Sequence, residues 1–102
     1  MENINESQAW IVKVRKCADV CTTNAGVCKE EGLTECEQLC MECAAACNRV
    51  LAEGETNAML FEKCADACNA CATECDKHDH QHCTHCAEVC RQCKEECDSM
   101  AV

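Results

Sequence analysis

The sequence predicts an all-α fold, an antiparallel up-down-up-down four-helix bundle with a cysteine-lined core, on three observations. The 102 residues contain no proline and only three glycines, so few positions interrupt a helix. The cysteines recur as C-x3-C-x2-C-x3-C, and at about 100° per residue all four positions of such a block fall on one face of a helix. The connections between blocks are short, which makes consecutive helices antiparallel neighbours.

Four helices are expected in turn, each bounded by a local signal. They should span about residues 6–30, 34–53, 56–77 and 80–100. Gly32 ends the first helix, and Thr34 with Glu37 is a capping box for the second. Gly54 separates the second helix from the third, and Asp79 is the expected N-cap of the fourth. The chain, residues 1–102, is short enough to form a single domain.

The composition shows what this core must be made of. Leu, Ile, Val and Phe together form less than a fifth of the chain and the net charge is −10, values that are typical of a disordered protein. The sixteen cysteines reverse that interpretation, because a reduced or metal-bound cysteine is buried like a small hydrophobic residue. We therefore expect a core of sulfur and alanine.

The four cysteine blocks are alike except for one position. They span residues 17–28, 36–47, 64–75 and 86–97. In the first block, CADVCTTNAGVC, Asn24 stands where the others have their third cysteine. A buried asparagine needs hydrogen-bond partners, so Asn24 should bond neighbouring groups, hold the helix register or offer a weak carbonyl contact. The alternative is that it marks a lost cysteine.

The two ends of the predicted bundle differ. One end gathers an apolar plug of Trp10, Ile11, Val14, Val50, Leu51, Leu60, Phe61 and Met100. At the other end the second loop reads KHDHQHC. His78 continues the stripe of the third helix and His82 begins that of the fourth, so both should face the lumen. His80 and His85 fall off the stripes and should face solvent.

Several classes of function are excluded by composition. An acidic chain with one Trp, one Phe and no Tyr lacks the basic stripe and stacking aromatics of a nucleic-acid binder. The N-terminal MENINESQAW lacks the features of a secretory signal, and no run approaches the length of a membrane span, so we expect no membrane partner and a cytoplasmic location. In that reducing compartment, dense cysteine indicates metal binding rather than disulfides.

Among soft metals, the spacing favours Cu(I). Thiolates select Cu(I), Zn(II) or Fe–S clusters. A structural zinc site uses only four ligands, whereas this chain has sixteen cysteines. Bacterial Fe–S ligation expects C-x2-C-x2-C-x3-C-P, and this sequence contains no proline. Two-coordinate Cu(I) needs sulfurs ~4.5 Å apart, which a C-x3-C pair with Cβ atoms about 5–6 Å apart can supply. Thiolates that each bridge two Cu(I) ions form a neutral array, whereas a zinc array would bury excess negative charge.

Two segments carry a family resemblance. CADACNACATECDKHDHQHCTHCAEVCRQCKEEC, together with CEQLCMECAAAC, resembles the cytosolic branch of the bacterial cysteine-rich four-helix-bundle copper storage proteins. The resemblance covers about residues 33–100, and more weakly 10–30, where the first helix is poorer in cysteine. It implies storage of multiple Cu(I) ions per chain, without enzymatic turnover, in a homotetramer. It also implies that histidines at the open end of the bundle help copper to enter. The copper donor or acceptor protein is unknown. The metal ligands implied are Cys17, Cys21, Cys28, Cys36, Cys40, Cys43, Cys47, Cys64, Cys68, Cys71, Cys75, Cys83, Cys86, Cys90, Cys93 and Cys97, with His78 and His82 at the mouth.

Other interpretations of the cysteines remain open at this point. A metallothionein-like zinc or cadmium scavenger would use the same thiols, and a thiol oxidoreductase could use Cys83 and Cys86, which have flanking histidines. An interhelical disulfide framework is disfavoured, because the inner C-x2-C steps have poor disulfide geometry within a helix. His78 and His82 could also form a solvated turn without binding metal, and Met41 lies about 100° off its stripe and is not counted as a ligand.

Overall fold

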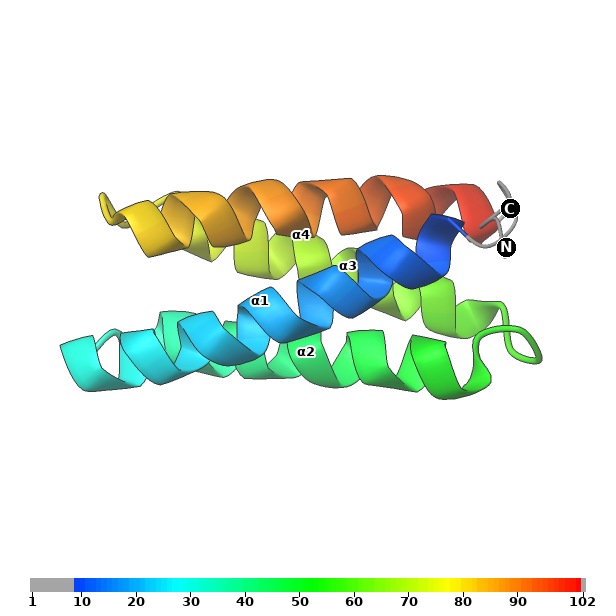
Figure 1. Ribbon diagram of the computed structural model, residues 1–102, viewed down its shortest axis with the longest axis horizontal. Helices are drawn as coiled ribbons and strands as arrows, with labels where there is room; N and C mark the ends of the chain where they lie inside the picture. The colour runs from blue at the N-terminus through cyan, green and yellow to red at the C-terminus, as the bar shows by residue number, and fades with distance from the viewer. Residues whose placement is uncertain (1–8, 102) are drawn as a thin grey trace, which may run out of the picture.

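The computed structural model describes residues 9–101, which form four helices. They are α1 (Ala9–Glu31), α2 (Thr34–Glu53), α3 (Met59–Cys75) and α4 (Gln81–Met100). Consecutive helices run in opposite directions, and each helix packs against two neighbours, with α1 against α4 closing the bundle (Figure 1). The principal extents are 40 × 30 × 18 Å. The predicted all-α four-helix fold is confirmed.

The bounds of α2 agree with the prediction, whereas α3 is shorter at both ends than the expected 56–77. Before α3, Thr56 N and Asn57 N both donate to Glu53 O, at 3.1 and 3.0 Å, so this stretch is a turn. Asn57 Oδ1 then accepts from Met59 N at 3.2 Å, and the helix begins there. After Cys75 the backbone hydrogen bonds join residues three apart instead of four, as in a 3₁₀ turn, and the α-helix ends. Residues 6–8 of the expected first helix lie outside the described residues.

The signals for the helix ends were partly wrong. Gly32 does end α1: its φ is 76°, and Leu33 N donates to Cys28 O at 2.9 Å in a Schellman arrangement. This turn makes Leu33 the N-cap of α2 and Thr34 the first helical residue, so the predicted capping box does not form. Asp79 is likewise not the N-cap of α4, because the extended residue before the helix is His80.

The predicted apolar plug exists at the end of the bundle where the described chain starts and finishes. Trp10 and Phe61 pack edge to face with ring centroids 4.9 Å apart. Val14, Val50 and Leu60 are buried around them. Ile11 and Leu51 are only partly buried at the margin of this cluster.

Met100 is the exception, since it is 36% exposed and does not belong to the plug. It occupies the last position of α4. Gly54 instead completes the plug: a Cβ atom there would lie 3.0 Å from Phe61 Cζ, so glycine permits the end of α2 to approach the ring.

Sulfur and alanine fill the core between the two ends, as predicted. All sixteen cysteines are buried, and six alanines pack beside them. These alanines are Ala18, Ala25, Ala44, Ala65, Ala72 and Ala87. No helix within residues 9–101 combines the length and the hydropathy that crossing a membrane requires.

Candidate metal site

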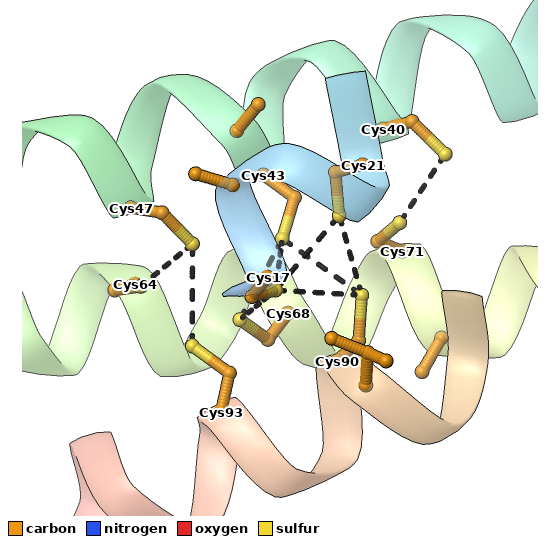
Figure 2. Packing of buried hydrophobic residues seen from close by; sticks show 14 of the residues in the cluster. Cys17, Cys21, Cys40, Cys43, Cys47, Cys64, Cys68, Cys71, Cys90 and Cys93 are labelled. Carbon is orange, nitrogen blue, oxygen red and sulfur yellow. Dashed lines mark hydrogen bonds between the residues drawn. The ribbon is translucent and has the colours of Figure 1, made fainter. Parts of the chain in front are cut away.

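The lumen of the bundle is a continuous array of free thiols. Cys17 Sγ lies 3.8 Å from the sulfurs of Cys21 and Cys43 and 3.9 Å from those of Cys68 and Cys90. Figure 2 shows these side chains converging from all four helices. Because the sulfurs meet both within a helix and between helices, a metal ion in the lumen would tie the helices together.

Groups of four sulfurs, all within 4.8 Å of one another, follow one another along the lumen. Four of these groups are Cys17, Cys47, Cys68 and Cys93; Cys17, Cys21, Cys43 and Cys90; Cys21, Cys71, Cys86 and Cys90; and Cys40, Cys71, Cys75 and Cys86. Each group shares at least one cysteine with the next. A thiolate shared in this way can bridge two metal ions, which is the connectivity of a cluster rather than of isolated sites.

The histidine end adds a group of mixed donors. Cys28 Sγ, Cys83 Sγ and a ring nitrogen of His82 lie within 4.8 Å of one another. Nδ1 of His82 is 3.6 Å from Cys83 Sγ, while its Nε2 is 2.8 Å from Glu31 Oε1. Burial raises the pKa of the Cys28 thiol to about 12 and also raises that of Cys83. Metal binding here must therefore displace thiol protons.

Deeper in the lumen, neighbouring thiols change the acidity of one another. Hydrogen bonds from Cys47 and Cys68 lower the pKa of Cys64 to about 6, against the opposing effect of burial. Those from Cys17 and Cys21 lower the pKa of Cys90 to about 2. A thiolate that accepts several S–H donors is stabilised, whereas burial favours the neutral thiol.

The four histidines are placed differently from one another. His82 is 26% exposed and lies beside the cysteines, whereas His78 Nε2 is 3.0 Å from Glu74 Oε2. Glu74 is buried and is also bonded by Lys77 at 3.2 Å, and the His78 bond is the main reason why its pKa is lowered. The expected exposure of His80 and His85 is confirmed.

Asn24 is buried, at 3% exposure, and uses both ends of its amide. Nδ2 donates to Cys40 Sγ at 3.3 Å and to Cys75 Sγ at 3.7 Å. Oδ1 faces Nδ1 of His82. The expectation that Asn24 bonds neighbouring groups is confirmed.

Two acidic residues of this end, Glu74 and Glu31, were not singled out from the sequence. Glu74 could have been found from its four-residue spacing to His78 on one helix face. Glu31 contacts His82 across 51 residues, and no local pattern indicates that pairing.

Comparisons with known proteins agree with this geometry. The profile of a family described as copper storage protein matches residues 3–102. An uncharacterised cysteine-rich protein of Bacillus subtilis, YhjQ, is 39% identical over 85 residues, covering 76% of this chain and 79% of that protein.

Two solved structures are similar over almost their whole length. The Cu(I)-bound copper storage protein BsCsp3 has a TM-score of 0.87 and 37% identity, covering 96% of this chain and all of that one. A cytosolic copper storage protein from Streptomyces lividans, solved with five coppers during copper loading, has a TM-score of 0.82 and 31% identity, with 90% and 88% covered. The family match over residues 3–102, together with these relatives, places the chain in the copper storage protein family.

Proposed function

We propose that this protein stores Cu(I) in the cytoplasm, holding many ions per chain on the thiolates of its lumen without catalytic turnover. The observation that carries the proposal is the series of four-sulfur groups that share cysteines along the bundle. The cytoplasmic location rests on the Streptomyces relative, which is described as cytosolic. Residues 1–102 act as one metal-binding domain, and the chains assemble as a homotetramer.

The sulfur separations suit Cu(I) after small adjustments. Contacting sulfurs lie between 3.3 and 4.0 Å apart, and a two-coordinate ion needs ~4.5 Å. Side-chain rotation and a slight separation of the helices supply the difference. An array in which each thiolate bridges two ions approaches roughly one Cu(I) per thiol and stays neutral, so it can remain buried.

The proposed ligands are the sixteen buried cysteines, with His82 as a donor at the entrance. His78 has a lesser role, because the Glu74 carboxylate already engages its Nε2. Copper then enters between the loops at the histidine end, since the opposite end is closed by the Trp10 and Phe61 rings.

Anaerobic Cu(I) titration followed by native mass spectrometry tests the proposal. The expected result is more than about ten ions per chain with helix content retained, as bridging thiolates require. The same titration after alkylation of the thiols should show almost no binding. Saturation at two to four ions, or displacement of Cu(I) by Zn(II) in direct competition, would contradict copper storage.

A further inference from the structure

Asn24 lies between two sets of metal-binding side chains. The inner set is the sulfur group of Cys40, Cys71, Cys75 and Cys86, which shares cysteines with the groups deeper in the lumen. The outer set is Cys28, His82 and Cys83. The amide nitrogen of Asn24 bonds the inner set and its oxygen bonds the outer set.

The amide interrupts the sulfur array on the α1 side of the lumen. The other three blocks have a cysteine at this position, but a primary amide offers Cu(I) no soft donor. Sulfur contacts continue on the opposite side, from Cys28 to Cys36 at 3.3 Å and from Cys36 to Cys75 at 3.8 Å. Copper moving from the outer set to the inner set therefore has a sulfur route along α2 and α3, and none through position 24.

The same amide weakens the outer set itself. Both N–H groups of Asn24 face sulfur, so its oxygen is an acceptor, and the atom facing it, Nδ1 of His82, must carry a proton. Nδ1 is also the ring atom 3.6 Å from Cys83 Sγ. Cu(I) binding between Nδ1 and Cys83 must therefore break the hydrogen bond to Asn24 and displace that proton.

The outer set meets solvent through His82. A surface pocket of about 300 Å³ between α1 and α4 is lined in part by Asn24, His82 and His85. A small copper donor or chelator can approach His82 there, since its side chain is 26% exposed. The thiols of Cys28 and Cys83 are buried, like the inner sulfurs, so copper reaches them through His82.

We propose that Asn24 is a positioning residue that divides the copper store into a labile outer Cu(I) site of Cys28, His82 and Cys83 and a slowly exchanging inner store. The outer site exchanges quickly because the Asn24 oxygen competes for His82 and because position 24 adds no second sulfur link beside the one through Cys36. This inference rests on the proposed function.

Copper release tests the division. The loaded wild-type protein is mixed anaerobically with an excess of a chromophoric Cu(I) chelator, bathocuproine disulfonate, and release is followed with time. We expect two phases, with a fast phase of about one ion per chain, the number that a three-donor site holds. Asn24→Cys should abolish the fast phase, because the new thiolate joins the outer ion to the inner array.

Two further variants separate this effect from general damage. Asn69→Cys adds a thiol at an exposed position of α3 and should leave the fast phase unchanged. His82→Ala removes a donor of the outer site, so it should eliminate the fast phase and preserve the slow one. If Asn24→Cys fails to fold, the His82→Ala result alone decides.

The metal-free protein provides an independent measurement. In ¹⁵N NMR spectra, Nδ1 of His82 should show a hydrogen-bonded proton that is lost in Asn24→Ala and unaffected in Asn69→Cys. A single release phase at full copper capacity, or a fast phase unchanged in both Asn24→Cys and His82→Ala, would overturn the division while leaving storage intact. A capacity of two to four ions would instead refute the storage function itself.

Discussion

The two ends of the bundle are built from the same helices and serve opposite purposes. At the plug end, Trp10 and Phe61 pack edge to face above Val14 and Val50, all of them buried. At the histidine end, polar side chains pair with one another: His82 bonds Glu31 and Asn24, and His78 bonds Glu74. Burying a side chain such as Phe61 stabilises the fold by ~1.5–3 kcal/mol, whereas a partly exposed histidine–carboxylate pair contributes ~0–1 kcal/mol.

This difference indicates that the packing that stabilises the bundle is concentrated at one end, whereas the proposed function assigns copper exchange to the other. The plug end closes the lumen with contacts that are costly to break, so copper has no path through it. The histidine end is held by polar contacts that open at little cost, as the proposed entry of copper there requires. Three perturbations, taken from the largest expected effect to the smallest, test this comparison.

Removing the plug ring should have the largest effect. Phe61→Ala is expected to destabilise the metal-free protein by ~3–5 kcal/mol, because a cavity is left under Trp10 and opposite Gly54. Urea unfolding followed by circular dichroism measures this loss. Met59→Ala, which removes a 65% exposed side chain two residues away, is the control and should change stability by less than ~0.5 kcal/mol. Similar losses in both variants would show that the plug is not the stable end.

Alkaline pH should destabilise the bundle through its buried thiols, and Cys28 contributes to this loss at the histidine end. The Cys28 thiol has its pKa raised from 9.0 to about 12 by burial, so folding favours its neutral form. Its stabilising contribution is complete below pH 9 and is lost as the pH rises from 9 toward 12. Urea unfolding of the reduced, metal-free protein at pH 8 and pH 10 should therefore show a smaller pH-dependent loss in Cys28→Ala than in the wild type.

Val50→Ala is the matched control for that measurement, because it truncates a buried residue at the plug end and removes no titrating group. It should lower stability equally at both pH values. An identical pH dependence in Cys28→Ala and the wild type would show that this thiol is not held in its neutral form.

Replacing the histidines should have the smallest effect on the amount of copper bound at equilibrium and should instead lower the rate of copper loading. His78→Ala combined with His82→Ala is expected to slow Cu(I) loading more than it lowers final capacity, since most of the donor atoms are cysteines. Stopped-flow transfer from a Cu(I)–chelate donor measures the rate. Of the two single variants, His82→Ala should slow Cu(I) loading more, because His78 is already hydrogen-bonded to Glu74. Loading as fast as the wild type in the double variant would remove the proposed role of this end.

Much of the fold follows from local pattern, because the helical repeat alone decides which side chains share a face. The spacing of cysteines placed all sixteen in the core, and the apolar residues at one end of each stripe identified the plug. Met100 was misplaced because the periodicity assigns a face to the last residue of a helix but does not show whether another helix covers it there, and Met100 is 36% exposed. The caps at Thr34 and Asp79 failed because the turn after Gly32 and the extended His80 set where each helix starts.

By itself, then, the sequence determined four helices, a thiol-lined lumen and two unlike ends, since each depends on residues within a few turns of one another. The tertiary structure decided which polar groups meet at the open end. Asn24 reaches His82 across 58 residues and Cys75 across 51. Those pairings depend on the rotation and the axial offset of α1 against α3 and α4, which side-chain packing determines and no local periodicity contains.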